Sequence, residues 1–165
     1  MSASQARVYL DNASTTTMLP AARDAWLRAT QSTGNPSSLH ASGRQARQVV
    51  EEAREQIAAA LRTRPSAVVF TSGGTESDNL AIKGIAWARR RATGVPMRIL
   101  TSAIEHHAVL DPVRWLAEHD EFAVTWLGVN EVGRVDVAEV AAALNDASLP
   151  APALCSVMWA NNEIG

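Results

Sequence analysis

From residue 66 onward, stretches with strand-like character alternate with stretches that carry a helical repeat of apolar residues. We expect strands at about 66–71, 97–102, 122–127 and 153–160, and helices at 75–91, 107–119 and 136–146. Strands separated by helices of this length form βαβ crossovers, which give a mostly parallel sheet with helices on both faces. The pattern therefore predicts an α/β fold.

The part of the chain before this alternation adds one strand candidate and two helices. The strand candidate is Val8 to Leu10, and a first helix begins near Pro20, a residue that suits the first helical position. A longer amphipathic helix is predicted over 42–61, where apolar residues repeat at intervals of three and four. Ser42 and Gln45 have the spacing of a capping box at its start.

Length, charge and hydropathy narrow the class of protein. A chain of 165 residues can bury a core, and we expect one domain. The net charge of -2 gives no broad basic field, which argues against nucleic acid or an anionic membrane as the main partner. No apolar run approaches the ~18 residues of a membrane span, and the N-terminus has no signal-peptide centre. We expect a cytoplasmic protein.

Three residue types give further expectations. Cys155, the single cysteine, excludes an internal disulfide, and its place in an apolar run predicts a buried, inert thiol. Lys83 is the only lysine, because fourteen of the fifteen basic residues are arginine. The five tryptophans are expected in the core and in interfaces: Trp26, Trp87, Trp115, Trp126 and Trp159.

Polar residues gather directly after three of the expected strands. In an open parallel sheet, ligands bind beyond the carboxyl ends of the strands. The residues at these ends are Gly73, Gly74 and Thr75, then Glu105, His106 and His107, and then Asn161 and Asn162. We therefore expect three separate segments to place polar side chains at one edge of the sheet.

The turn Gly73-Gly74 before Thr75 has two interpretations. In the first it is an anion site, because glycines let the backbone approach a ligand and a helix N-terminus offers unpaired N–H groups. In the second, Thr75 and Asp78 form a capping box, and Glu76 and Asp78 favour the helix dipole without a ligand. Two carboxylates in the first turn would repel a phosphate unless they point away. The local pattern alone favours the second interpretation.

The histidine and asparagine residues are weak signals when each is taken by itself. An isolated histidine such as His106 is typical of a surface or core position, and adjacent histidines are not spaced as metal ligands on one helical face. The expected position of His106 opposite the anion site strengthens the case for a functional role, since an imidazole there could stack on a ring or move protons. Asn161 and Asn162 are typical turn residues, but their position at a strand end leaves a functional role open.

Five motifs together form a specific pattern. They are LDNASTT (10–16), GNPSSLH (34–40), FTSGGTESDNLAIKG (70–84), EHHAVL (105–110) and ANNEIG (160–165). In this order and spacing they closely resemble the N-terminal part of cysteine desulfurases of the NifS and IscS type, which are pyridoxal-phosphate enzymes of the class V aminotransferase group. The resemblance implies the large-domain architecture of fold type I. Residues 1–41 would be its N-terminal segment and loops, and 42–165 a helix plus alternating strand and helix units.

The resemblance also implies roles for individual residues. Gly74 and Thr75 would bind the phosphate of pyridoxal 5'-phosphate, His106 would stack on its pyridine ring and move protons, and Asn162 would lie near its ring oxygen. Asn35 would line the substrate region. In the family, L-cysteine becomes L-alanine while a loop cysteine keeps the sulfur as a persulfide. That sulfur passes to an acceptor or scaffold protein in iron–sulfur cluster assembly or thiolation, and the full-length form is expected to be a homodimer.

The same resemblance indicates a fragment. The family's pyridine-nitrogen aspartate, Schiff-base lysine, nucleophilic cysteine and small C-terminal domain would all follow Gly165. Lys83 lies about 12 Å along the helix axis from Thr75 at 1.5 Å per residue, so we expect a solvated residue that does not replace the missing lysine. Cys155, expected to be buried, does not replace the missing thiol. We expect the 165-residue chain alone to be inactive.

Two other functions stay open at this point. One is a related class V enzyme, such as a selenocysteine lyase, because the residues that distinguish these enzymes would lie beyond Gly165. The other is a noncatalytic, truncated paralogue that binds a phosphate or a partner protein through an unfinished sheet, since an unpaired strand edge favours association.

Overall fold

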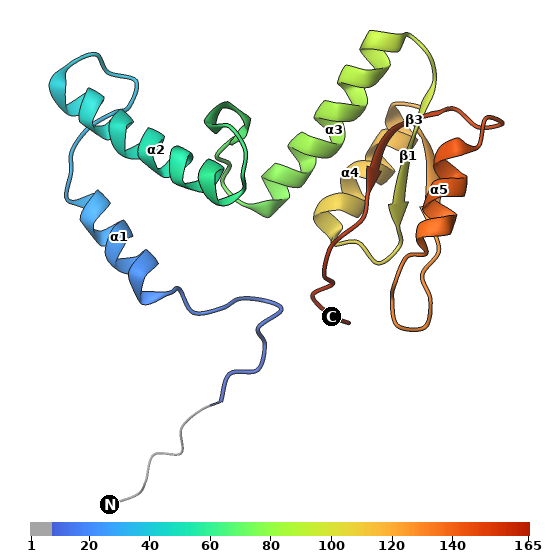
Figure 1. Cartoon of the computed structure of the whole chain (residues 1–165), viewed down its shortest axis with the longest axis horizontal. Coiled ribbons are helices and arrows are strands. Elements are labelled where there is room, and N and C mark those ends of the chain that lie inside the picture. The colour runs from blue at the N-terminus through green and yellow to red at the C-terminus, as the bar shows by residue number, and fades with distance from the viewer. Residues whose placement is uncertain (1–7) are drawn as a thin grey trace, which may run out of the picture. The chain divides into compact units, whose positions relative to one another are not determined.

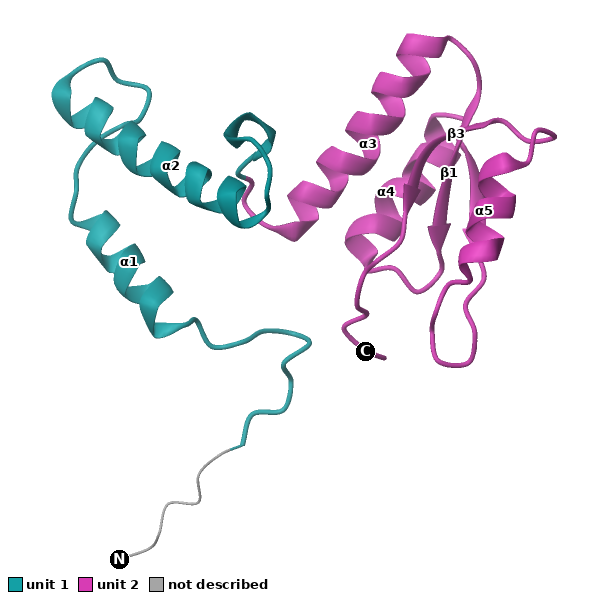
Figure 2. Ribbon diagram, viewed as in Figure 1, with its two compact units in different colours: residues 1–70 teal, residues 71–165 magenta. Residues whose placement is uncertain are grey.

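The computed structural model describes residues 8–165, and the chain falls into two compact units (Figure 2). The first unit comprises residues 1–70 and the second residues 71–165. Residues 1–7 lie outside the described residues. They belong to the N-terminal segment in which the sequence predicts no signal peptide. Within the described part, no helix combines the length and the apolar character needed to cross a membrane.

The first unit contains two α-helices and one short 3-10 helix. They are α1 (Pro20–Thr30), α2 (Ala41–Ala60) and η1 (Pro65–Ala67). Pro20 is the first residue of α1, as expected. The capping box predicted for α2 is wrong, because His40 caps this helix and its Nδ1 accepts from the Gly43 N–H at 3.3 Å. Ser42 lies inside the helix, and its hydroxyl is 3.0 Å from the same Nδ1.

The loop before α2 folds back onto the start of that helix. A β-carbon on Gly43 would lie 2.4 Å from the carbonyl oxygen of Ser38, and one on Gly34 would lie 2.4 Å from that of Ser42. These are approaches that only glycine permits. Within the loop, the Asn35 side chain accepts from the Ser37 N–H at 2.9 Å. The two glycines therefore allow the GNPSSLH loop to pack tightly against α2.

Two of the expected strands do not form. Val8 to Leu10 is exposed and pairs with no described residue, and the 66–71 stretch contains part of η1 followed by irregular chain. Apolar β-propensity is not enough to make a strand, because a strand also needs a pairing partner. Phe70 instead lies under the Arg54 guanidinium, 4.8 Å from the ring centroid, and Arg54 also donates to the Val68 carbonyl at 2.6 Å.

The second unit has the alternating architecture that the sequence predicts. Its elements are α3 (Gly74–Thr93), β1 (Met97–Ser102), α4 (His107–His119), β2 (Ala123–Leu127), α5 (Val137–Asn145) and β3 (Ala151–Ser156). The three strands are parallel, in the order β2-β1-β3 (Figure 1). The α/β fold with a parallel sheet is confirmed, and the strand predicted over 153–160 begins and ends earlier than expected.

Helices cover both faces of this sheet, with α3 and α4 on one face and α5 on the other (Figure 1). The central strand β1 is buried along its whole length. Its side chains alternate, so that Met97 and Ile99 join the apolar core formed with α3 and α4 while Arg98 turns to the α5 side. The other buried members of this core are Ile82, Ala86, Val109, Val113, Leu116, Phe122 and Ala153.

Arg98 is a buried cation on β1 whose hydrogen bonds link α5 to the sheet. Its side chain is almost fully buried, and its guanidinium donates to the carbonyls of Pro150 (2.6 Å) and Ala143 and to the Thr125 hydroxyl (3.0 Å). Ala143 belongs to the last turn of α5, where backbone carbonyls have no helical partner and a positive charge is favourable. The guanidinium therefore supplies the hydrogen bonds that this helix end needs.

The tryptophans and the cysteine differ from expectation. None of the five tryptophans is buried, and Trp159 is fully exposed, so their assignment to the core is wrong. Trp87 of α3 and Trp115 of α4 instead form an edge-to-face pair between these two helices, with centroids 6.4 Å apart.

The burial predicted for Cys155 is also wrong, because β3 is an edge strand of the described sheet and leaves this residue exposed. Partial desolvation and then the nearby Glu105 carboxylate raise the pKa of its thiol. At neutral pH the thiol form therefore predominates, which does not suit a nucleophile.

Candidate functional site

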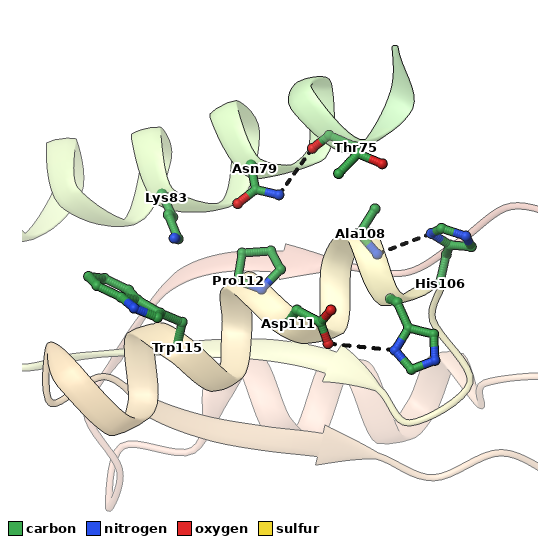
Figure 3. A pocket seen from close by; sticks show the side chains of 9 residues that line it. Thr75, Asn79, Lys83, His106, Ala108, Asp111, Pro112 and Trp115 are labelled. Atoms are coloured by element: carbon green, nitrogen blue, oxygen red, sulfur yellow. Dashed lines mark hydrogen bonds and ion pairs between the residues drawn. The ribbon is translucent and has the colours of Figure 1, made fainter.

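A cleft of about 300 Å³ lies between the first half of α3 and the N-terminal half of α4 (Figure 3). Its lining residues are Thr75, Asn79, Lys83, His106, His107, Ala108, Asp111, Pro112 and Trp115. Thr75 and His106, which lie 31 positions apart in the sequence, therefore line the same cleft. Two of the three polar segments predicted to converge therefore do so, although the strand expected before Thr75 does not form, and Asn161 and Asn162 do not line this cleft.

The start of α3 has free backbone donors. Gly73 is the N-cap residue, and no side chain within residues 8–165 makes a capping hydrogen bond there, so the predicted Thr75–Asp78 capping box is wrong. The N–H groups of Gly74, Thr75 and Glu76 have no hydrogen-bond acceptor among the described residues, as expected for the first turn of a helix without a side-chain cap. A β-carbon on Gly73 or Gly74 would meet no described atom within 4 Å, so the surroundings of this turn are open.

Glu76, the acidic residue in the first turn of α3, has a partner of its own. One carboxylate oxygen of Glu76 accepts from both the N–H and the hydroxyl of Ser72, each at 2.6 Å. These two hydrogen bonds, the hydroxyl first, lower the pKa of Glu76. Asp78 is half-buried and close enough to Glu105 to contribute to the raised pKa of that residue. The Glu76 charge is thus directed back at Ser72.

His106 occupies the N-cap position of α4. Its Nδ1 accepts from the Ala108 N–H at 3.0 Å (Figure 3), which assigns the proton of the neutral ring to Nε2. The adjacent His107 has a different partner, because its Nδ1 lies 3.5 Å from the Asp111 carboxylate. The ring edge that carries Nε2 is therefore the part of His106 left for proton transfer or hydrogen bonding.

Lys83 lies in this cleft, so the prediction of a solvated residue is wrong in part. Its side chain is half-buried, and the Nζ atom lies 4.1 Å from the centroid of the Trp115 ring. Trp115 in turn stacks on His119, with ring centroids 5.0 Å apart. This contact could not be predicted from the sequence, because it joins two helices whose relative rotation depends on the core packing.

Glu105 and Asn161 are functional candidates to which the sequence assigned no site role. Glu105 is only 6% exposed, and its Oε1 accepts from the Met158 N–H at 2.6 Å and from the Ser102 hydroxyl at 3.4 Å. The Asn161 amide donates to the Ile104 carbonyl at 2.7 Å. Both residues fall in the polar clusters after strands, and a carboxylate directly after a buried strand is the signal that could have singled out Glu105.

The other predicted site residues lie outside this cleft. Gly74 is the first residue of α3, next to Thr75. Asn162 is exposed, and its amide donates to the neighbouring Glu163 carboxylate at 3.0 Å. Its neighbour Asn161 lines a second cavity of about 860 Å³. Asn35 belongs to the first unit, in the loop before α2.

The fold and the cleft define an α/β protein with an uncapped helix start and a histidine at one edge of a parallel sheet. Residues 8–165 match the family model described as Aminotransferase class-V, and the chain belongs to that family. This family depends on pyridoxal phosphate.

Relatives with curated names are similar over nearly the whole chain. The IscS-like cysteine desulfurase of Mycobacterium tuberculosis (strain ATCC 25618 / H37Rv) is 56% identical over 157 residues, which are 95% of this chain and 39% of that protein. The cysteine desulfurase IscS of Neisseria meningitidis serogroup A is 47% identical over 160 residues, with 96% and 38% covered. The chain thus spans about 40% of the length of the relatives it matches.

Solved structures share the fold. A NifS-like protein superposes with a TM-score of 0.85 at 32% identity, covering 97% of this chain and 42% of the other. DndA from Streptomyces lividans gives a TM-score of 0.76 at 39% identity, with coverage of 94% and 42%. A structure of SspA in complex with cysteine gives 0.75 at 32% identity, with coverage of 92% and 42%. The partial fold type I architecture is confirmed by these similarities.

Proposed function

We propose that this chain supplies the cofactor-phosphate site and the proton-transferring histidine of a pyridoxal-phosphate-dependent cysteine desulfurase. The observation that carries the proposal is the cleft in which Thr75, at an uncapped helix start, and His106, at a second helix start, occur together. The names of the relatives support the choice of cysteine desulfurase within the family.

The start of α3 fits a phosphate group. Its first-turn N–H groups have no acceptor within residues 8–165, the helix dipole favours an anion, and the exposed residue Thr75 carries a hydroxyl beside them. Gly74 leaves room for the close approach of phosphate oxygens, because nothing in the described chain fills the space where its β-carbon would stand. We propose that Gly74 and Thr75 bind the phosphate of pyridoxal 5'-phosphate.

His106 fits the role of ring neighbour and proton carrier. Its backbone is fixed as the N-cap of α4, and its Nδ1 is held by the Ala108 N–H, so the plane of the ring is set by the helix. The Nε2 position is then the one that holds or releases a proton. When bound, pyridoxal phosphate supplies an electron sink for bond cleavage in the amino-acid substrate.

We also propose roles for two asparagines, Asn162 beside a ring oxygen of the cofactor and Asn35 in binding the substrate. Asn162 makes one exposed hydrogen bond, to the adjacent Glu163, so its amide is free to turn toward a ring oxygen at little cost. Asn35 keeps its carbonyl and side-chain oxygen on the local turn through Ser37 and Ser38, and its amide nitrogen could reach a substrate. These two assignments are proposals that follow from the motifs GNPSS and ANNEIG.

We extend the proposal to the reaction and its partners. The substrate is L-cysteine, the product is L-alanine, and the sulfur leaves as a persulfide for an acceptor or scaffold protein in iron–sulfur cluster assembly or thiolation. The full-length form would act as a cytoplasmic homodimer. The names of the cysteine desulfurase relatives, and the SspA structure in complex with cysteine, support the choice of amino acid. Residues 1–165 alone are expected to be inactive.

The binding step can be tested on the chain itself by two-dimensional ¹⁵N NMR. Titration with pyridoxal 5'-phosphate should shift the amides of 73–76 and of His106, and inorganic phosphate should shift only the first group. Thr75→Val should weaken binding of both by about tenfold or more, the cost of losing a hydrogen bond to a charged group. Thr93→Val, at the other end of α3, is the control and should bind normally. Shifts confined to other parts of the chain would reject the site.

The chemistry is tested with the complete polypeptide that the gene encodes. Alanine and sulfide formed from L-cysteine would support the desulfurase, and selective turnover of L-selenocysteine would favour a selenocysteine lyase. Cofactor binding without turnover of either amino acid would favour a noncatalytic binding module. His106→Ala should greatly reduce turnover while leaving phosphate binding largely intact; unchanged turnover would remove His106 from its role.

A further inference from the structure

Glu105 is a buried acid to which the proposed function gives no task. It directly precedes His106, in the turn between β1 and α4, and only 6% of its surface is exposed. Its Oε1 accepts from the Met158 N–H at 2.6 Å and from the Ser102 hydroxyl at 3.4 Å. A buried carboxyl group that receives a backbone N–H from a segment 53 positions away ties two distant parts of the chain together.

Those two parts are the segments that carry His106 and Asn162. Glu105 reaches from the turn after β1 to Met158, which follows β3. Asn161 reaches in the opposite direction and donates to the carbonyl of Ile104 at 2.7 Å. The two hydrogen bonds are reciprocal cross-links between the same two segments, and they hold the carboxyl ends of β1 and β3 side by side.

The groups that surround the Glu105 carboxyl favour its uncharged form. Burial is the largest cause of its raised pKa, the Met158 and Ser102 hydrogen bonds act in the opposite direction, and the charge of Asp78 on α3 adds to the increase. Cys155 on β3 is the other titratable group influenced by it. Because hydrogen-bond acceptance does not require a negative charge, an amide oxygen could serve in place of the carboxyl.

We propose that Glu105 is a positioning residue that fixes His106 relative to the Asn161–Asn162 turn by accepting the Met158 N–H. His106 itself gains no direct contact from it. The carboxyl oxygen anchors the backbone one residue before the N-cap of α4, so the direction of the imidazole ring depends on this anchor. The proposal rests on the proposed function only for what His106 does, since the cross-link exists in the chain by itself.

The cross-link predicts a graded series of variants at this position. Glu105→Gln keeps an acceptor oxygen at the same distance along the side chain, and Glu105→Leu has a similar volume without one. Glu105→Asp retracts the oxygen by one methylene, from a contact that is now 2.6 Å long. We expect the Gln variant to behave like the parent chain and the Leu and Asp variants to lose the contact.

A matched control exists in the same unit. Glu139 on α5 also accepts a backbone N–H from the end of a strand region, that of Gly128 at 2.9 Å, but it lies outside the cleft that His106 lines. Glu139→Leu therefore removes the same type of hydrogen bond without touching the proposed cross-link. It controls for the loss of one such hydrogen bond, and because Glu139 is exposed, Glu105→Gln serves as the control for a change at the buried position.

The first test is amide exchange and ring NMR on the 165-residue chain. In Glu105→Leu the Met158 amide should exchange about tenfold faster or more, and the His106 ring signals should shift or broaden, whereas Glu105→Gln should leave both unchanged. Glu139→Leu should affect Gly128 and spare Met158 and His106. Unchanged exchange and ring signals in Glu105→Leu, or equal effects of Glu139→Leu, would overturn the proposal.

The second test uses the complete polypeptide loaded with pyridoxal phosphate. Glu105→Leu should lower kcat at least about tenfold with a smaller change in KM, because the ring is misdirected while the phosphate site on α3 remains. Glu105→Gln should keep the kcat of the parent. If the site required a charged residue at this position, Glu105→Gln would lose activity as Glu105→Leu does. If the parent polypeptide binds no cofactor, the proposed function fails while the NMR result still decides the positioning role.

Discussion

The ammonium group of Lys83 on α3 stands 4.1 Å above the ring centroid of Trp115 on α4. Trp115 makes two further ring contacts, edge-to-face with Trp87 and stacked with His119. The contacts of Trp115 with Lys83 and Trp87 join the two helices whose N-terminal residues line the candidate site, whereas His119 belongs to α4 itself. Lys83 and Trp115 line the same cleft as Thr75 and His106.

Removing the ammonium group should measure this contact. Lys83→Met should lower the free energy of unfolding by about 0.5–1 kcal/mol, and a double-mutant cycle with Trp115→Leu should return a coupling energy of the same size. Urea denaturation followed by circular dichroism provides the values. Arg89→Met on the same helix is the control for loss of a surface cation. A coupling energy near zero would mean that the contact contributes nothing to the packing of α3 on α4.

Glu105 predicts a pH dependence of stability. Its pKa in the folded chain is raised above the ordinary 4.5, chiefly by burial, so the fold favours the protonated form. The stability that this preference contributes is fully present below 4.5 and is lost as pH rises through the folded pKa.

Urea midpoints measured from below 4.5 to above neutrality should therefore show a weaker pH dependence in Glu105→Gln than in the parent. The other ionisable groups are the same in both proteins, so their contributions cancel in the difference. Parallel curves for the two proteins would show that the carboxyl is solvated in the folded state. A steeper rise of parent stability with pH would reverse the sign of the shift.

Gly43 should tolerate no side chain. Its β-carbon position lies 2.4 Å from one backbone carbonyl oxygen and 2.9 Å from another, those of Ser38 and Asn35. Gly43→Ala should destabilise the loop and the start of α2 by about 1–3 kcal/mol, since backbone must move. Gly84→Ala is the opposite control, because the space around Gly84 in α3 is open and alanine should stabilise that helix by about 0.5–1 kcal/mol.

Local unfolding can be read from amide exchange of residues 35–46 for Gly43→Ala and of α3 for Gly84→Ala. Equal protection factors in the parent and the Gly43→Ala chain would contradict the close packing of the loop against α2.

Arg98 should be the most sensitive position in the sheet. Arg98→Met would leave the carbonyls of Ala143 and Pro150 without their donor, at up to about 1–3 kcal/mol for each of these partly buried acceptors. Arg98→Lys should recover only part of the loss, because an ammonium group lacks the fork of N–H donors. The free energy of unfolding and the exchange of the last turn of α5 check this. Full stability of Arg98→Met would show that water replaces the guanidinium.

The helices and strands of the second unit could be predicted because its residue types, its apolar repeats and its turn residues all indicate the same elements. β1, α4 and β2 begin and end within one residue of the predicted bounds, since an apolar strand, a helical repeat and turn residues all point the same way. The strand end that carries His106 could be inferred from topology alone, because parallel strands bring their carboxyl ends to one edge. Thr75 lines the same cleft as His106, although the strand expected before Thr75 did not form.

The remaining differences depend on tertiary partners that a local pattern does not contain. Phe70 and its neighbours have strand-forming residue types, but no strand among residues 8–165 pairs with them. His40, and not Ser42, caps α2, because the preceding loop turns the imidazole onto Gly43. Cys155 is exposed because its strand ends the described sheet. The Glu105 cross-link joins positions 53 residues apart, a distance at which spacing carries no signal.

The most direct measurement is a crystal structure of the complete polypeptide grown with pyridoxal 5'-phosphate. The account predicts that the phosphate oxygens accept from the N–H groups at the start of α3 and from the Thr75 hydroxyl, with the His106 imidazole against the pyridine ring. A cofactor phosphate bound elsewhere in the protein, with the start of α3 facing only solvent, would contradict it.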